Sequence, residues 1–172
     1  MSNIANNKPQ CGAEYNGMLA ILPNGKQVSP NTHSGGFHGT RNFAPSQVFI
    51  TGIPKKGTDR RLKEHCDGND QSAFRGTTIQ ILHTPDGPGA ALFAQVGGWV
   101  YEIEKVPTWD TVQQLQGRVP SVTGFGNCPT AGELEFAIPA IVEPYRIVRA
   151  AEIVAGRGTR VKVGKWHPNP NF

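Results

Sequence analysis

The sequence predicts an α+β fold, a small sandwich of short strands with helices concentrated in the first half of the chain. Gly and Pro account for 21 and 14 of the 172 residues, which favours a loop-rich fold over a helical one. Only 17% of the residues are charged, so the Glu- and Lys-rich faces of long solvated helices are scarce. Strand-like and helix-like segments, all short, alternate along a chain whose length suits one domain.

The first fifty residues predict a polar lead-in followed by one strand and one helix. Residues 1–35 are polar and interrupted by Pro and Gly, so we expect a flexible lead-in with one strand at the apolar patch 18–22. Residues 36–40 are typical of a short strand that ends in a turn. Residues 45–52 predict a short helix, with Ser46 as its N-cap and a glycine just beyond its end.

The middle of the chain contains the clearest strand. Residues 59–65 predict one or two helical turns, and the β-branched and aromatic residues of 72–82 predict a strand. A Pro/Gly loop at 85–89 precedes a small helix at 90–96. Residues 98–106 alternate apolar and polar side chains at period two, which indicates a half-buried strand.

The last third predicts two further strands separated by loops. Residues 108–116 favour a short helix, and residues 117–132 form a Gly/Pro-rich loop. Residues 133–138 and 145–154 are strand-like. The basic residues 156–172 are expected to form a tail that wraps the surface of the same domain.

Charge and cysteine content exclude some classes of protein. The net charge is +4 and the sequence pI is about 9.1, a modest positive field that helps anions approach and that is also common in ordinary domains. There is no run of eighteen apolar residues, so no membrane helix is expected, and the first eight residues lack the apolar stretch of a signal peptide. The three cysteines form no C-x-x-C pair, and neither His65-Cys66 nor His83 has metal-ligand spacing, so we expect no metal site.

Four short segments follow one another along the chain in an order that carries a family resemblance. They are Phe-His-Gly-Thr at 37–40, Ser-Ala-Phe-Arg-Gly-Thr-Thr at 72–78, Gly-Trp-Val-Tyr-Glu-Ile at 98–103 and Glu-Leu-Glu at 133–135. Between the first two lies Val-Phe-Ile-Thr-Gly-Ile-Pro-Lys-Lys-Gly at 48–57. This order resembles the bacterial mono-ADP-ribosyltransferase toxins of the pertussis and cholera type, over most of the chain.

The resemblance implies a fold, a substrate and a boundary. The expected architecture is the ADP-ribosyltransferase fold, two small packed β-sheets with short helices mainly in the N-terminal half. The catalytic domain would span residues 36–155. The chain would cleave NAD⁺ as a co-substrate, without a metal, and transfer ADP-ribose to a macromolecular acceptor.

The Glu-x-Glu pair suits this chemistry. Cleavage of the nicotinamide–ribose bond passes through an oxocarbenium-like transition state, which a nearby carboxylate stabilises. Side chains two residues apart in a strand point to the same face. By resemblance, Glu135 would hold the ribose hydroxyl and Glu133 would orient or deprotonate the acceptor. Alone, a Glu-x-Glu pair is as well explained by the solvent face of a strand.

Three further positions carry the resemblance, with two departures. Thr77 and Thr78 match the last two residues of the family's Ser-Thr-Ser segment, which braces the NAD⁺ pocket and the catalytic Glu. Gly76 replaces the first serine, so its hydrogen bond to Glu135 must be missing or come from one of the two threonines. His38 stands where the pertussis and cholera branch has Arg.

The His38 segment resembles a different branch of the family. Phe-His-Gly-Thr is similar to the diphtheria-toxin and poly-ADP-ribose polymerase branch, in which His bonds the adenine ribose and Gly backbone atoms bind the nicotinamide amide. That similarity makes His38, Gly39 and Thr40 NAD⁺-binding candidates. Arg41 would supply a cation to the pyrophosphate.

The acceptor is expected to be protein rather than nucleic acid. Phe125 lies where the family carries its substrate-recognition turn, and it would either stack on a target arginine or base or anchor the loop. Two glutamates in the pair resemble the arginine-modifying members, whereas DNA-guanine modifiers usually have Gln first. Protein arginine is therefore the expected acceptor.

Two other functions remain open. The same site could act as an NAD⁺ glycohydrolase that uses water as the acceptor, and the basic run 156–166 could make the chain a nucleic-acid or protein-binding module. If the chain is a toxin domain, we expect it to be secreted or delivered into a target cell as part of a larger effector and to act in the target cytoplasm. A cognate immunity protein is then expected as a partner, and a membrane is not.

Overall fold

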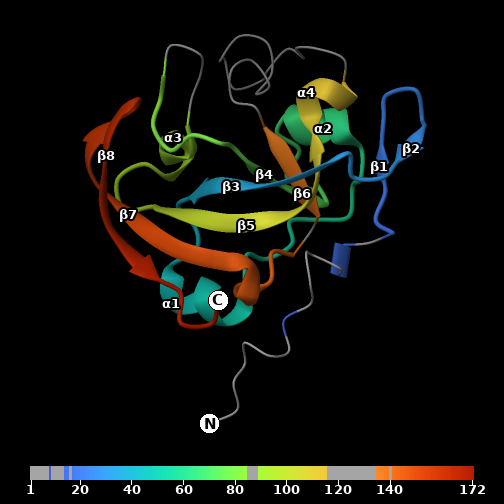
Figure 1. The fold of residues 1–172 in the computed structure, drawn as a ribbon. Coiled ribbons are helices and arrows are strands. Elements are labelled where there is room, and N and C mark those ends of the chain that lie inside the picture. The colour runs from blue at the N-terminus through green and yellow to red at the C-terminus, as the bar shows by residue number, and fades with distance from the viewer. Residues whose placement is uncertain (1–7, 9–13, 16, 85–88, 116–134, 140) are drawn as a thin grey trace.

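The computed structural model consists of two antiparallel β-sheets that share one long strand, with short helices around them (Figure 1). The two sheets of the expected fold class are confirmed. The structure describes residues 8, 14–15, 17–84, 89–115, 135–139 and 141–172.

The first sheet is built around β5, which spans Trp99–Asp110. On one side β5 pairs with β3 (Thr32–Thr40), and on the other with β7 (Ile147–Arg157), which in turn pairs with β8 (Arg160–Pro168). All of these pairings are antiparallel, and Figure 1 shows β3, β5 and β7 side by side in the centre of the molecule. The alternation that predicted a strand at 98–106 is confirmed, and the strand continues four residues further.

The second sheet uses the far end of the same strand. There β6 (Phe136–Pro139) pairs with Trp109 and Asp110 of β5, and with β4 (Phe74–Thr77) on its other side. Strand β3 also reaches the end of β4, because Phe37 and Thr78 exchange two backbone hydrogen bonds of 2.8 and 3.0 Å. The ends of β3, β4 and β6 are thereby held close together. A separate two-stranded hairpin consists of β1 (Ala20–Ile21) and β2 (Gln27–Val28).

All four expected helical segments contain a helix. These are α1 (Pro45–Thr51), α2 (Leu62–Cys66), α3 (Ala90–Ala94) and α4 (Thr111–Gln114), and a 3₁₀ helix, η3, spans Pro144–Arg146. The longest helix of the described residues, α1, has seven residues, well short of the length that crosses a bilayer.

The N-cap of helix α1 lies two residues earlier than expected. Its N-cap is Ala44, so Ser46 is not the cap, and no side chain caps this end. Pro45 occupies the first helical position, where its missing N–H and restricted φ favour helix initiation. Gly52 ends the helix as predicted: its φ is 79°, and its N–H donates to the carbonyl of Val48 (2.8 Å).

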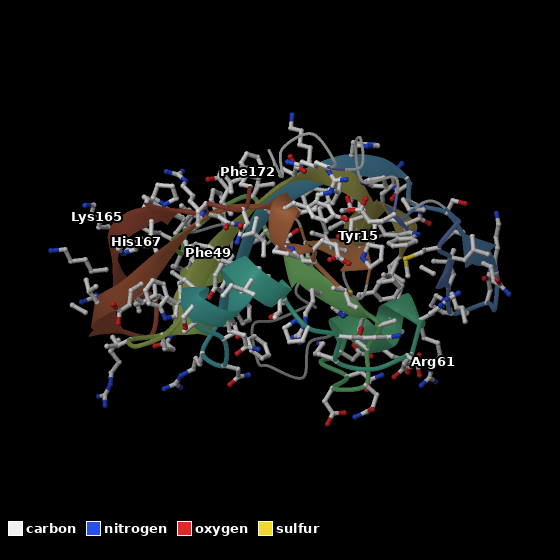
Figure 2. The ribbon with its side chains drawn as sticks, turned by 90° about the horizontal axis from the view of Figure 1, so that it is seen from below. Tyr15, Phe49, Arg61, Lys165, His167 and Phe172 are labelled. Atoms are coloured by element: carbon white, nitrogen blue, oxygen red, sulfur yellow. The ribbon has the colours of Figure 1, made fainter. Side chains whose placement is uncertain are left out.

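Two predicted segments differ in the structure. The strand expected at 72–82 is limited to β4, because Ser72 and the chain before it belong to a loop closed on Asp59, and within residues 78–82 a bridge is made at Thr78 alone. The run expected to wrap the surface as a tail instead forms β8, an edge strand of the main sheet. After β8 the chain returns to α1, where the Asn171 amide donates to the carbonyl of Phe49 (2.6 Å), and Figure 2 shows Phe49 and Phe172 on the same part of the molecule.

Two buried clusters hold the elements that surround the site. One joins α2 to the second sheet through Leu62, Phe74 and Trp109, with the Phe74 and Trp109 rings 5.2 Å apart. The other packs the three alanines of α3 against Val100 and Ile153 of the main sheet. The clusters therefore hold α2 against the second sheet and α3 against the main sheet.

Candidate active site

A cavity of about 290 Å³ lies where β3, β4, α2 and α3 meet the start of β6. Its walls combine apolar, glycine and titratable residues from segments far apart in the sequence. They are Phe37, His38, Gly39, Lys56, His65, Cys66, Gly68, Gly76, Thr77, Thr78, Ala90, Phe93 and Glu135.

His38 of β3 is partly buried, and one of its two ring nitrogens has no hydrogen-bond partner among the described residues. Its Nδ1 lies 2.8 Å from the carbonyl oxygen of Gly76, which can only accept, so Nδ1 carries the proton and donates. In the neutral ring Nε2 is then an acceptor, and it is buried without a hydrogen-bond partner among the described residues. Burial lowers the pKa of His38 to about 4, so the ring is neutral at pH 7. The cavity wall therefore offers an acceptor that a ligand hydroxyl or amide N–H would satisfy.

Glu135 is a nearly buried carboxylate in the same cavity, with 8% of its surface exposed. Its backbone carbonyl accepts hydrogen bonds from the amide and the hydroxyl of Thr111 (3.2 and 3.0 Å), which anchors the residue to the start of α4. Its Oε1 lies 2.8 Å from Nε2 of His65, a residue of α2. The ring is not aligned for a good hydrogen bond, so this is a close polar contact.

Gly76 of β4 leaves the space that the carboxylate occupies. A Cβ atom at Gly76 would lie 2.9 Å from Oε1 of Glu135 and 3.3 Å from its Cδ. The serine expected from the family pattern is therefore replaced by a residue that lets the carboxylate approach the strand. Thr77 does not take over the missing bond, because its hydroxyl reaches the carbonyls of Gly35 and Phe136 (3.1 and 3.4 Å).

Lys56 brings a positive charge to the cavity. Among the described residues it makes neither a hydrogen bond nor an ion pair. Burial lowers the pKa of its ammonium group and nearby Arg75 lowers it further, whereas the Glu135 carboxylate raises it. An unpaired, partly desolvated ammonium group is a good binding partner for an anionic ligand.

The structure brings most of the predicted site residues together. His38, Gly39, Thr77, Thr78 and Glu135 all line the cavity. Gly39 also allows β3 to approach α3, because a Cβ atom there would lie 1.8 Å from the carbonyl oxygen of Ala90.

Four predicted residues are placed elsewhere or lie outside the described residues. Thr40 is buried beside the cavity, where its hydroxyl accepts from the Asn42 amide (3.2 Å), and Arg41 is exposed; neither lines the cavity. Glu133 and Phe125 lie outside the described residues.

Sequence reasoning missed His65 and Lys56. His65 was expected on a helical turn and was set aside as a site residue because His65-Cys66 lacks metal-ligand spacing; within the described chain no three His, Cys, Asp or Glu side chains form a metal-binding group. Lys56 falls within the run 48–57 that carried the resemblance, but nothing in its local pattern distinguishes it from an exposed lysine. Both enter the site through tertiary contacts.

Comparisons with known proteins identify the fold. Neither a protein-family model nor a curated protein sequence matches the chain. Among solved structures it is similar to the Scabin toxin from Streptomyces scabies in complex with NADH, with a TM-score of 0.62 and 17% identity over 84% of this chain and 79% of that one. It is also similar to a structure described as a guanine-specific ADP-ribosyltransferase, with a TM-score of 0.61 and 16% identity over 84% of this chain and 81% of that one. The chain therefore has the ADP-ribosyltransferase fold.

Proposed function

We propose that the protein is a toxin-type, NAD⁺-dependent mono-ADP-ribosyltransferase with Glu135 as its catalytic carboxylate. The observation that carries the proposal is one cavity that contains both a nearly buried carboxylate and a neutral histidine with an unsatisfied acceptor. This cavity occurs in a fold shared with a toxin solved with NADH.

The cavity residues fit the nicotinamide-ribose half of NAD⁺. A volume of about 290 Å³ is close to the lower end of the range of about 300–1,000 Å³ found for small-molecule sites. The acceptor at His38 Nε2 matches a ribose hydroxyl or the carboxamide N–H, and Lys56 matches the phosphates. We therefore assign binding to His38, Gly39, Thr77 and Thr78 as well as to Lys56.

NAD⁺ supplies an electrophilic ribose carbon whose bond to nicotinamide breaks with its electron pair leaving on nicotinamide. Glu135 stabilises the positive charge that develops on the ribose, and its burial strengthens that interaction because little water screens it. We retain Glu133 as the group that accepts the proton of the attacking acceptor, a role proposed from its position two residues before Glu135.

We propose a guanine base in nucleic acid as the acceptor, in place of the protein arginine favoured by the Glu-x-Glu pair. One solved structure with this fold is described as guanine-specific. Exposed cations also follow the β7–β8 hairpin, namely Arg157, Arg160, Lys162 and Lys165. Figure 2 shows Lys165 and His167 on β8 at the opposite end of the molecule from Arg61 of the α2 segment.

The hairpin is joined to the cavity wall through aromatic contacts. Trp166 of β8 packs against Phe37, which lines the cavity, with ring centroids 6.2 Å apart. The guanidinium of Arg149 lies 4.1 Å from the centroid of the Trp166 ring. A polyanion bound along β8 would therefore lie next to the cavity wall that Phe37 forms.

The activity is tested with NAD⁺ labelled on its adenine half. The wild-type chain should release nicotinamide, and Glu135→Gln should lower kcat by about 10²–10³-fold, the usual loss when one electrostatic contact to the transition state is removed. Glu152→Gln, which removes a carboxylate of β7 that does not line the cavity, should leave kcat unchanged. Equal activity of the two variants would contradict the assignment of Glu135.

The acceptor is identified in parallel reactions with DNA, RNA, free guanosine and a protein extract. Label and an ADP-ribose mass shift on guanine are expected. Label on arginine in the protein extract alone would refute the guanine proposal and restore arginine. Nicotinamide release without any labelled acceptor would identify an NAD⁺ glycohydrolase.

For the biological setting, we propose delivery into a target cell and action in its cytoplasm, with an immunity protein that covers the NAD⁺ cavity. Co-expression with genes adjacent to that of the toxin tests this: an immunity protein should restore growth and block nicotinamide release in vitro.

A further inference from the structure

Three residues from separate elements form a polar chain that ends at Glu135. Ser72, just before β4, lies with its Oγ 2.8 Å from Nδ1 of His65, and Nε2 of His65 lies 2.8 Å from Oε1 of Glu135. All three are buried, with exposed fractions of 1%, 7% and 8%. Buried polar groups in such a chain are positioned strongly, because each loses its partner if it moves.

Hydrogen-bond direction follows from the groups involved. The backbone N–H of Phe74 donates to Oγ of Ser72 (3.0 Å), and because an ionised carboxylate next to Nε2 can only accept, both ring nitrogens are best satisfied when Ser72 donates its hydroxyl proton to Nδ1 of His65. With Nδ1 as the acceptor, the neutral imidazole carries its proton on Nε2, which faces Glu135. A small rotation of the ring would align this N–H with the carboxylate, as often happens when a ligand enters.

We propose that His65 is the positioning residue for Glu135, and that Ser72 sets its tautomer. The inference rests on the proposed function of Glu135. His65 thus supplies, from α2, the donor that the family pattern places on β4 at the position of Gly76. The two features belong together, since a side chain at Gly76 would collide with the carboxylate that His65 holds.

The segment that carries His65 is closed into a firm loop. Asp59 closes the loop with three hydrogen bonds. The N–H of Asp59 donates to the carbonyl of Gln71 (2.9 Å), its carbonyl accepts from the N–H of Ala73 (2.7 Å), and its carboxylate accepts from the side chain of Asn69 (2.7 Å). On the inner side Leu62 packs in the cluster with Phe74 and Trp109. Such a loop can hold an imidazole to the precision that a catalytic carboxylate requires.

A purely structural role for His65 is the competing explanation. Its ring packs edge-on against Phe74, with centroids 5.7 Å apart, and a histidine can serve there as a core aromatic residue. His65→Phe preserves that packing and removes the donor. His65→Gln preserves a donor near the position of Nε2 and removes the ring.

The two explanations predict opposite orders of activity. If His65 positions Glu135, His65→Phe should lower kcat about 30-fold with KM for NAD⁺ within about twofold, and His65→Gln should recover most of this loss. If the ring is only packing, His65→Phe should keep its activity and its melting temperature, and His65→Gln should lose both. Glu64→Gln, a change on the same helix at a residue that does not line the cavity, is the control.

A second measurement does not depend on turnover. ¹⁵N NMR of the imidazole should show the proton on Nε2 of His65, and Ser72→Ala should shift the balance between the two tautomers. A proton on Nδ1 in the wild type would overturn the inference whether or not the chain consumes NAD⁺. If the tautomer is as proposed and NAD⁺ is not consumed, only the proposed function fails.

Discussion

Replacing Gly76 by alanine perturbs the carboxylate of Glu135 and almost nothing else. The added Cβ would lie 2.9 Å from Oε1, about 0.5 Å inside the 3.4 Å at which ordinary contacts begin. The atom it meets is the end of a side chain, and the three nearest atoms all belong to Glu135. Because the new Cβ meets no backbone atom among these three, we expect strand β4 to keep its position and the Glu135 carboxylate to be displaced.

The size of the effect follows from that displacement. A misplacement of 1 Å at a reacting group can cost about 100-fold in rate, so a shift of about half that distance should lower kcat by about 10-fold, or about 1.4 kcal/mol in the activation free energy. Stability should change little, because alanine is at least as favourable as glycine within a strand. The shift also separates Oε1 from Nε2 of His65.

The assay is steady-state nicotinamide release, with kcat and KM determined separately and the melting temperature measured on the same sample. Gly164→Ala is the control for packing strain, because its Cβ would lie 2.7 Å from Cγ1 of Val154 and 3.0 Å from the backbone carbonyl oxygen of Glu152, both in β7 and away from the cavity. Unchanged kcat in Gly76→Ala would refute the claim that this carboxylate position is the reacting one. An equal loss in Gly164→Ala would indicate a general packing effect instead.

Three further predictions concern charge. Burial lowers the pKa of His38 from 6.5 to about 4, so the unfolded chain binds the proton more readily than the folded one. The free energy of unfolding should therefore fall by roughly 3 kcal/mol as the pH drops from about 7 to 4. In urea denaturation measured over this pH range, His38→Leu should remove that part of the pH dependence. Arg146→Met should lower the free energy of unfolding by about 3 kcal/mol in urea, because Arg146 is 2% exposed and its loss removes the guanidinium partner of the Glu14 carboxylate and leaves Glu104 paired with Lys8 alone. Lys56→Met should raise KM for NAD⁺ about 10-fold with a smaller change in kcat, the loss expected for one charge-assisted contact.

Local sequence patterns predicted strands and helices well where a single signal, such as alternation or a terminal glycine, was strong. The alternation at 98–106 identified β5, and glycine at position 52 identified the end of α1. The error at 156–172 came from giving more weight to the basic and Pro-containing composition of this segment than to its alternation. Arg160-Val161-Lys162-Val163 alternates in the way an edge strand requires, with Val161 buried against the α3 cluster and Lys162 exposed, and this signal was present in the sequence.

The sequence predicted only those site residues that belong to the four segments whose order along the chain carried the resemblance. His38, Thr77, Thr78 and Glu135 were identified because the four segments keep that order, and the fold then brings them to one cavity. His65 was not, because a histidine on a five-residue helix has no period or spacing that points to a partner seventy residues away. The closure of the loop on Asp59 and the packing of Leu62 bring its ring to the start of β6.

The two departures from the expected pattern, His38 and Gly76, are connected through Gly76 itself. The carbonyl of Gly76 accepts the Nδ1 proton of His38, and this makes Nε2 of His38 an acceptor for a ligand. The missing side chain of the same glycine makes room for Glu135 and leaves its orientation to His65. Replacing His38 by Arg alone would leave the Gly76 carbonyl without that donor, and replacing Gly76 by Ser alone would displace the carboxylate. The histidine, the glycine and His65 therefore form one arrangement, and changes toward the family residues should succeed only in combination.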